Sequence, residues 1–324
     1  MAPLPITIAC WDYDRTRALL DGRVTVDGCD ATFLTMPIEE MFTRALTHGE
    51  FDVSELSFSN FMAQCGRGEN AYTLIPVFPS RSFRHSAFFI RTDRGIERPE
   101  DLKGRLVGVR EYTMTAAVVA RGILADEYGI GPGDIRWCMG DVDVRERESI
   151  EAPALARDID VTVAPDGNFL DSMLRSGEID ALLAYKPPPC FLDNAPHVGR
   201  LFPDYVRDEK AYFKKTGIFP IMHPVGVKTG LMKQHPWLAE SLCTAFEKAK
   251  AIAMDDLRAV QALKIALPWL ADAVGETVAI MGPEFWPYGI DANRTALEAL
   301  TRQAYEQGVT ARRLTLEEMF SAEG

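Results

Sequence analysis

A short cationic segment carries the side chains that an anionic substrate would need. Arg81, Arg84 and His85 lie in the run Pro79–His85, between two expected strands. Arginine presents a planar fork of donors that matches a carboxylate in two-point contact. We therefore expect Arg81 or Arg84 to bind a carboxylate, with His85 beside it. A solvated cationic loop held by a salt bridge is the alternative.

A second anion site is expected where a strand runs into a helix near residue 113. Free backbone N–H groups and the helix dipole attract an anion at such a terminus. Arg110, Thr113 and Thr115 lie there, and a threonine hydroxyl would add a donor. Ordinary capping of the helix by Thr113 is the alternative.

Two more basic residues are candidates to contact a ligand. Arg15 lies at the start of the first expected helix, where it either reaches the ligand or pairs with Asp12 or Asp14. Lys186 ends a later strand, and its alternative is a place on a loop of three prolines. The sequence leaves both choices open.

Two residues suit proton transfer. Glu55 lies near the end of an expected strand, where burial raises the pKa of a carboxylate and suits it to acid or base work; a structural pair with an arginine is the alternative. Ser57 follows as a candidate ligand contact. His223 lies where we expect the chain to return to its first part, and a histidine can transfer protons near neutral pH. A lone histidine is more often a packed or surface residue.

The motifs of metal and nucleotide sites are missing from the sequence. There is no His-Glu-x-x-His and no phosphate loop, and Gly129–Gly133 follows a helix without dinucleotide-loop spacing. We therefore expect no metal and no cofactor.

Trp286 and Tyr288 are candidates for a platform under an aromatic ring, although a packing role is more common.

Composition excludes several classes of protein. A net charge of −12 argues against a nucleic-acid partner, because phosphate binding needs a basic surface. No apolar stretch approaches the ~18–20 residues of a membrane span, so no membrane partner is expected. Six scattered cysteines and an N-terminus without a secretion signal indicate a cytoplasmic protein with reduced thiols. A homo-oligomer remains open.

Strands and helices alternate along the chain, which predicts α/β lobes with mostly parallel sheets. The expected strands cover 6–10, 31–36, 51–57, 72–78, 85–92, 105–109, 134–139 and 179–185. The main expected helices cover 38–46, 113–128, 169–176, 236–258, 260–269 and 294–307, and residues 140–167 look irregular. With 324 residues the chain can form two cores. We expect lobe one at 1–98 and 222–324, and lobe two at 99–221.

Several stretches spread over the whole chain carry a family resemblance. They are Asp12–Thr16, Phe51–Ser57, Phe78–Ser86, Gly104–Ala117, Gly217–His223 and Phe285–Ile290. Together they resemble the 4,5-dihydroxyphthalate decarboxylase family, within the type II periplasmic-binding-protein-like fold. The resemblance implies two lobes with a ligand cleft between them.

The same resemblance implies an activity, which is conversion of 4,5-dihydroxyphthalate to 3,4-dihydroxybenzoate (protocatechuate) and CO2 in aromatic degradation. The partner would be a small aromatic carboxylate. We then expect Arg81, Arg84 and Arg110 to position carboxylates and His223 and His85 to transfer protons, with Glu55 as the acidic alternative. A solute-binding protein for an aromatic or sulfonate anion, without catalysis, is the competing hypothesis for the same fold.

Overall fold

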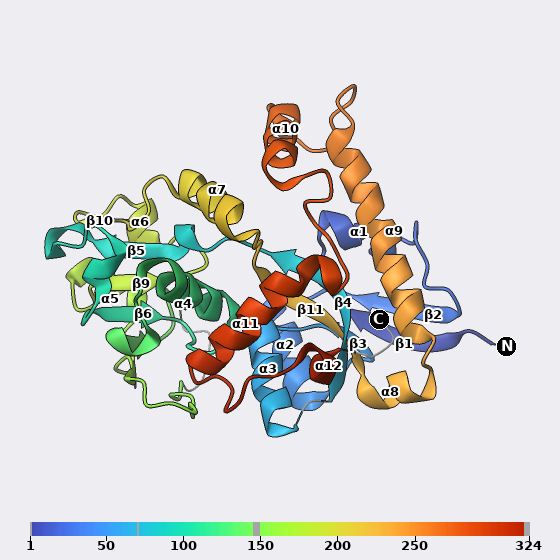
Figure 1. Ribbon diagram of the computed structural model, residues 1–324, viewed down its shortest axis with the longest axis horizontal. Coiled ribbons are helices and arrows are strands. Elements are labelled where there is room, and N and C mark those ends of the chain that lie inside the picture. The colour runs from blue at the N-terminus through green and yellow to red at the C-terminus, as the bar shows by residue number, and fades with distance from the viewer. Residues whose placement is uncertain (1, 70, 145–149, 321–324) are drawn as a thin grey trace. The chain divides into compact units, whose positions relative to one another are not determined.

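The chain divides into two compact units and passes between them four times (Figure 1). The computed structural model describes residues 2–69, 71–144 and 150–320. Unit 1 holds residues 1–81, 221–297 and 315–324, and unit 2 holds residues 82–220 and 298–314. The passage at 220/221 lies beside the expected boundary. The first passage comes earlier than residue 98, because the strand Phe88–Arg91 hydrogen-bonds within the sheet of unit 2.

Unit 1 is built on a mixed sheet in the order β2-β1-β3-β11-β4. Its strands are β1 (Leu4–Ala9), β2 (Cys29–Leu34), β3 (Val53–Glu55), β4 (Tyr72–Arg81) and β11 (Ile221–Lys228). The predicted parallel pairing is confirmed for β1 with β2 and β3. β11 returns from unit 2 and runs antiparallel to both β3 and β4, so the sheet is mixed.

The helices of unit 1 include those predicted at 38–46 and 236–258 and the start of the one predicted at 294–307, together with others that the sequence did not predict. They are α1 (Asp14–Leu20), α2 (Ile38–His48), α3 (Phe58–Arg67), α8 (Thr229–Gln234), α9 (Leu238–Arg258), α10 (Leu270–Met281), α12 (Leu316–Met319) and the start of α11 (Arg294–Glu306). The helix predicted at 260–269 is wrong. Its apolar side chains Val260, Leu263 and Trp269 stay 48% to 72% exposed, and a helix gains most of its stability by burying such a face.

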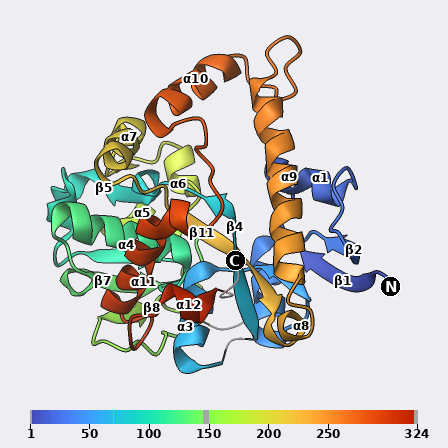
Figure 2. The same ribbon diagram turned by 45° about the vertical axis from the view of Figure 1, so that its right-hand side comes forward.

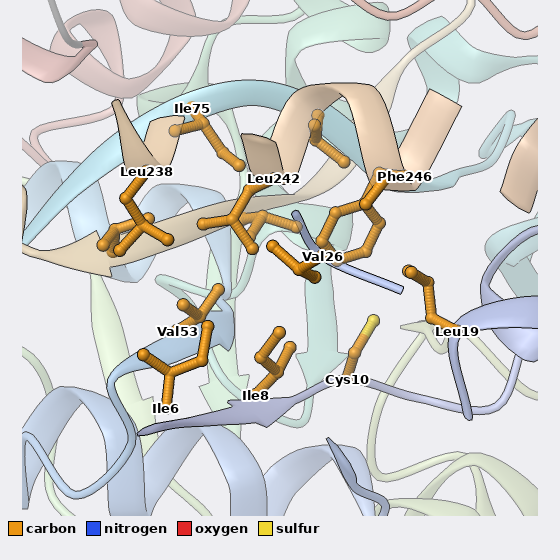
Figure 3. Packing of buried hydrophobic residues seen from close by; sticks show 14 of the residues in the cluster. Ile6, Ile8, Cys10, Leu19, Val26, Val53, Ile75, Leu238, Leu242 and Phe246 are labelled. Carbon is orange, nitrogen blue, oxygen red and sulfur yellow. The ribbon is translucent and has the colours of Figure 1, made fainter. Parts of the chain in front are cut away.

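Helix α9 covers the core of unit 1. Figure 3 shows Leu242 and Phe246 of α9 packed over strand residues such as Ile8. All three side chains are at most 1% exposed, and burying each is worth roughly 1.5–3 kcal/mol. Helix α1 lies along α9 in both ribbon views (Figures 1 and 2). This packing fixes the start of α1, where Tyr13 and Arg15 lie.

Unit 2 has a second mixed sheet, in the order β10-β5-β9-β6-β7-β8. Its strands are β5 (Phe88–Arg91), β6 (Leu106–Val109), β7 (Arg136–Met139), β8 (Val161–Val163), β9 (Ala181–Leu183) and β10 (Val198–Arg200). Its helices are α4 (Thr115–Tyr128), α5 (Leu170–Ser176), α6 (Pro189–Leu192), α7 (Tyr205–Thr216) and most of α11. The parallel pairs β9-β6-β7-β8 match the prediction, whereas β5 pairs antiparallel with both of its neighbours.

A buried arginine explains why residues 298–314 belong to unit 2. Arg121 of α4 is 2% exposed, and its Nε donates to Oε1 of Gln307 at 2.7 Å. The guanidinium also donates to the carbonyl of Tyr112 and stacks on that ring at 3.6 Å.

Among the described residues, no helix is long and apolar enough to cross a membrane.

Candidate active site

The sheet of unit 1 brings Glu55 and His223 together. Glu55 is the last residue of β3 and is fully buried. His223 lies on the neighbouring strand β11, where the pairing with β4 shifts register on both sides of it. Such an irregularity re-aims a side chain, and the adjacent Pro224 uses its carbonyl to accept from Leu56 N. The imidazole Nδ1 lies 2.6 Å from Oε1 of Glu55.

The Glu55 carboxylate accepts four hydrogen bonds. Oε1 receives His223 Nδ1 at 2.6 Å and the hydroxyl of Tyr13 at 2.7 Å. Oε2 receives the backbone N–H of Trp11 at 3.0 Å and the thiol of Cys10 at 3.4 Å. An ionised carboxylate has about four acceptor sites, so these partners use them all. The partner of Glu55 is thus a histidine rather than the arginine that we considered.

The ionised state of Glu55 follows from these contacts. Burial works to raise the pKa of Glu55, but the hydrogen bonds and charge of His223, with the bonds from Trp11 and Tyr13, hold it below its usual value. Burial and the nearby Glu55 charge raise the pKa values of the Cys10 thiol and the Tyr13 hydroxyl. Both groups therefore stay protonated and donate.

His223 keeps one nitrogen available. Its Nδ1 is committed to Glu55, and within the described residues its Nε2 has no hydrogen-bond partner. The side chain is 16% exposed, and the ring of Phe42 from α2 packs edge-on at 4.8 Å. A histidine held at one nitrogen, with the other reachable, is arranged for proton transfer.

Arg15 lies with its guanidinium against two aromatic rings. Its guanidinium carbon lies 4.1 Å from the ring centroids of both Tyr13 and Trp286. Its Nε donates to the carbonyl of Pro79 at 2.5 Å, and NH1 donates to Asp14 at 2.9 Å. The NH2 group makes no hydrogen bond in the part of the chain that the structure describes. Of the two choices that the sequence left open, the pairing with Asp14 is present, and it leaves one donor group for a ligand.

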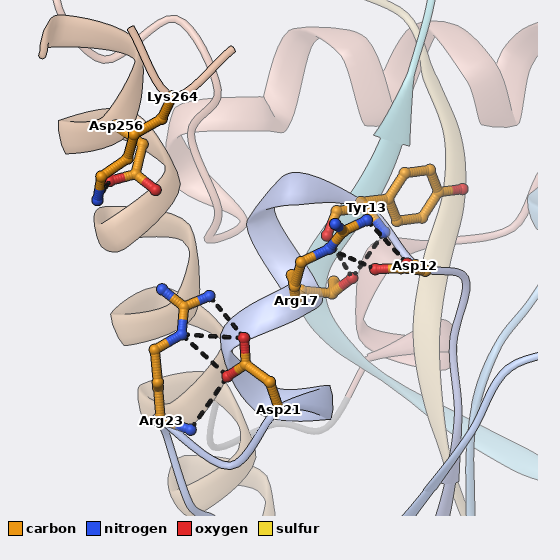
Figure 4. A network of polar contacts seen from close by, with 8 residues as sticks. Asp12, Tyr13, Arg17, Asp21, Arg23, Asp256 and Lys264 are labelled. Carbon is orange, nitrogen blue, oxygen red and sulfur yellow. Dashed lines mark hydrogen bonds and ion pairs between the residues drawn. The ribbon is translucent and has the colours of Figure 1, made fainter. Parts of the chain in front are cut away.

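The outer side of α1 carries ordinary ion pairs. Figure 4 shows Arg17 bonded to Asp12 and Arg23 bonded to Asp21, while the ring of Tyr13 points away from the Arg17 pair. Arg17 is 56% exposed and Arg15 is 13% exposed. The two arginines of this helix therefore differ in environment, although the sequence places them two residues apart.

Arg81 has a clear structural contact. Its NH2 donates to the carbonyl of Pro287 at 2.7 Å and to the side chain of Asn293, which ties the end of β4 to this segment. Burial lowers the pKa of Arg81 to about 9. Trp286 in the same segment donates to the carbonyl of Phe78 at 3.0 Å, and its ring packs against Arg15. A carboxylate-binding role for Arg81 stays a prediction.

Arg84 and His85 lie in unit 2. His85 is 2% exposed, the rings of Phe202 and Tyr212 lie at 5.2 and 5.4 Å, and burial lowers its pKa to about 4. It is therefore neutral at pH 7. Burial lowers the pKa of Arg84 to about 10, against the opposing charge of Glu209. This environment suits packing better than proton transfer by His85.

The other candidates of unit 2 surround the start of α4 and the end of β9. Arg110 follows β6 and is 8% exposed, and Thr115 begins α4 and is 3% exposed. The capping alternative for Thr113 is wrong, because Met114 is the cap residue and the Thr113 hydroxyl donates to Glu111 at 3.0 Å. Lys186 is exposed beyond β9.

Unit 1 thus joins three of the predicted residues, Glu55, His223 and Arg15, through Tyr13. Ser57 lies two residues beyond Glu55, at the N-cap position of α3 but without a side-chain capping hydrogen bond, and is 4% exposed. Tyr13 was not among the predicted residues, although it lies in the recognised stretch Asp12–Thr16. Within residues 2–69, 71–144 and 150–320, no three His, Cys, Asp or Glu side chains form a group that would hold a metal ion.

Comparison with solved structures confirms the predicted fold. The aliphatic sulphonate binding protein SsuA of Escherichia coli matches with a TM-score of 0.56 at 12% identity, covering 98% of this chain and 92% of that one. SsuA of Xanthomonas axonopodis pv. citri gives 0.52 at 14% identity over 99% and 98%. The desulfurization enzyme DSZB gives 0.51 at 15% identity over 99% and 97%. These likenesses establish the periplasmic-binding-protein-like α/β fold and nothing finer.

Two sequence relatives identify the family to which the chain belongs. No family model matches the chain. The 4,5-dihydroxyphthalate decarboxylase of Pseudomonas putida is 40% identical over 204 residues, covering 63% of this chain and 79% of that protein. The 4,5-dihydroxyphthalate decarboxylase of Comamonas testosteroni is 38% identical over 320 residues, which are 99% of this chain and 97% of the relative. Because that identity extends over nearly the full length of both proteins, the chain belongs to the 4,5-dihydroxyphthalate decarboxylase family.

Proposed function

We propose that this protein is a carboxy-lyase that converts 4,5-dihydroxyphthalate to 3,4-dihydroxybenzoate and CO2, a reaction suited to aromatic degradation. The family supports the substrate. The observation that carries the chemistry is His223, held by Glu55 at Nδ1 with Nε2 unengaged in the described structure. A protein that only bound the anion would have no need of a histidine prepared in this way.

The substrate supplies its own electron sink. Each carboxylate of 4,5-dihydroxyphthalate is para to a hydroxyl. When that hydroxyl is ionised, its electrons add to the ring and the carbon bearing the carboxylate takes a proton, which gives a dearomatised ketone. The carbon–carboxylate bond then breaks, CO2 leaves, and the bonding pair restores the aromatic phenoxide. Protonation of the phenoxide gives 3,4-dihydroxybenzoate, so one proton replaces one CO2.

His223 is the proposed donor of the proton to carbon. Glu55 holds the imidazole through Nδ1 and balances the charge of the imidazolium, and Nε2 carries the proton that is delivered. Positioned acid–base groups contribute about 10²–10⁴-fold to rate. Glu55 itself has every acceptor site occupied by protein donors and is fully buried. Its proposed role is therefore to position His223, rather than to donate the proton itself.

Arg15 is the proposed ligand for a substrate carboxylate. The rings of Tyr13 and Trp286 pack against its guanidinium, and its NH2 makes no hydrogen bond within the described residues that would compete. A preoriented guanidinium loses little entropy when it binds a carboxylate. Tyr13 contacts both Arg15 and Glu55, so the anion-binding and proton-transfer groups share one support.

The deciding experiment follows CO2 and 3,4-dihydroxybenzoate when purified, metal-stripped protein is incubated with 4,5-dihydroxyphthalate. We expect turnover, and we expect His223→Gln to lower kcat by about 10²–10⁴-fold. His235→Gln is the matched control, because His235 lies in the same unit and contacts Trp237 instead. Tight binding of the dicarboxylate without product, before and after metals are restored, would establish the solute-binding alternative.

A further inference from the structure

Two donors converge on a single oxygen of Glu55. His223 Nδ1 lies 2.6 Å and the Tyr13 hydroxyl 2.7 Å from Oε1. Ser80 pairs with His223 across β4 and β11, and its side chain interacts with the Tyr13 hydroxyl and works to lower the pKa of that hydroxyl, as a donor does. The result is a connected path from Ser80 through Tyr13 and Glu55 to His223.

Because His223 and Tyr13 share the acceptor Oε1 of Glu55, Tyr13 influences the position of the proton between Nδ1 and Oε1. In the short contact between Nδ1 and Oε1, the proton lies on whichever atom holds it more strongly. A second donor at Oε1 stabilises the carboxylate anion and lowers its affinity for the His223 proton. The Tyr13 hydroxyl therefore keeps this proton on Nδ1, and Ser80 keeps the hydroxyl oriented toward Glu55.

We propose that Tyr13 is a positioning residue of the decarboxylation: its hydroxyl, backed by Ser80, keeps Glu55 ionised and the shared proton on Nδ1 of His223. This inference rests on the proposed function of His223. The groups that face Glu55 are His223 from β11, Tyr13 and Trp11 N from the α1 entry, and the thiol of Cys10 after β1. The cation beside them is Arg15, which stacks on the Tyr13 ring.

A purely structural role predicts something different. In that case the loss of the Tyr13 hydroxyl would weaken folding and leave the chemistry of folded molecules unchanged. Tyr72 offers the matched control, because its hydroxyl donates to the carbonyl of Phe51 at 2.8 Å in the same unit, and the residue is 1% exposed. Tyr72→Phe removes a buried tyrosine hydrogen bond outside the proposed site.

The test compares Tyr13→Phe with Tyr72→Phe in kinetics. We expect Tyr13→Phe to lower kcat by about 10-fold or more, the scale of one hydrogen bond to a charged group, and to change KM by less than about threefold. Burial already works to raise the pKa of Glu55, and the bonds from His223, Trp11 and Tyr13 oppose it. Removing one of these bonds should raise the pKa of Glu55, so the pH at which kcat falls on the acidic side of its pH profile should move higher. Tyr72→Phe should leave both kcat and this pH unchanged.

A magnetic resonance measurement tests the same inference without substrate. The Nδ1 proton of His223 should give a downfield resonance that His223→Gln abolishes. Tyr13→Phe should move it further downfield, because Oε1 then draws the proton more strongly, and Ser80→Ala should move it the same way by less. Ser80→Ala also serves if Tyr13→Phe does not fold.

The outcomes separate the two proposals. If the native protein forms no 3,4-dihydroxybenzoate, the proposed function fails, and the resonance alone decides whether Tyr13 controls the shared proton. A second outcome is that the native protein turns over while Tyr13→Phe and Tyr72→Phe have the same kcat, the same pH profile and the same chemical shift of the His223 Nδ1 proton. In that case the positioning role is wrong and the proposed function stands.

Discussion

His223 Nδ1 lies 2.6 Å from Oε1 of Glu55, although 168 positions separate the two residues in the chain. The contact forms because β11 returns between β3 and β4 and runs antiparallel to both. Three more donors close around the carboxylate, from Cys10, Trp11 and Tyr13. A buried charge is tolerated when it is paired and fully hydrogen-bonded, and this one orients a histidine as well.

The first prediction concerns the pH dependence of stability that Glu55 produces. Its pKa in the folded protein is below the usual value of 4.5, so the unfolded chain takes up a proton first as the pH falls. The stabilisation is therefore present above pH 4.5 and is lost as the pH falls through the folded-state pKa. Glu55→Gln should remove it, at a cost of about 1–3 kcal/mol near neutral pH.

Urea unfolding of native protein and Glu55→Gln, between about pH 3 and pH 7, checks this prediction. The two stability curves should converge at the acidic end. Glu50→Gln is the control, since Glu50 pairs with Arg44 on the surface, where an ion pair contributes little to stability, and its curve should stay close to the native curve. Parallel curves for Glu55→Gln across the whole range would contradict the assigned ionisation.

The second prediction compares two arginines of α1 that lie in different environments. Arg15→Lys keeps the charge but loses the guanidinium that packs against Tyr13 and Trp286, so we expect KM for 4,5-dihydroxyphthalate to rise by about 10-fold or more. Arg17→Lys changes an exposed residue paired with Asp12, and KM should stay the same (Figure 4). Equal KM values for the two variants would remove Arg15 from the binding site. Steady-state kinetics at one ionic strength makes the comparison.

The third prediction tests the core and the exposed segment after α9. Leu242→Ala creates a cavity at a side chain that is 0% exposed and should cost about 2–5 kcal/mol of unfolding free energy. Leu263→Ala changes a leucine that is 48% exposed and should stay within about 0.5 kcal/mol. Denaturant unfolding measures both. A large loss for Leu263→Ala would show that residues 260–269 pack against a surface after all.

These contrasts mark how far the sequence predicts the molecule. Helix α9 is predicted well because its buried residues repeat at helical spacing, which is a local property. The same pattern fails at 260–269, since periodicity does not reveal whether a surface exists to receive the apolar face. The antiparallel course of β11 also escapes local patterns, because strand direction depends on the path of the whole chain.

The site shows the same limit. Glu55, His223 and Arg15 were singled out by residue type and position, but their mutual contacts are not encoded in any spacing. Tyr13 escaped because a tyrosine in a short polar run carries no periodic signal, and its role appears only when its hydroxyl reaches Glu55. A local motif search finds side chains with suitable chemistry, and the fold decides which of them meet.

The last prediction concerns His85, which the sequence suggested for proton transfer. Burial lowers its pKa from 6.5 to about 4, so the unfolded state binds a proton first as the pH falls from 6.5. Stability should therefore decrease between these pH values, by at most about 3 kcal/mol. In the described structure its Nδ1 is buried without a hydrogen-bond partner, between the rings of Phe202 and Tyr212. His85→Phe should flatten this part of the stability curve and leave kcat within about threefold of the native value. If instead His85→Phe lowers kcat as much as His223→Gln does, His85 takes part in the chemistry, and its burial serves to keep a neutral base.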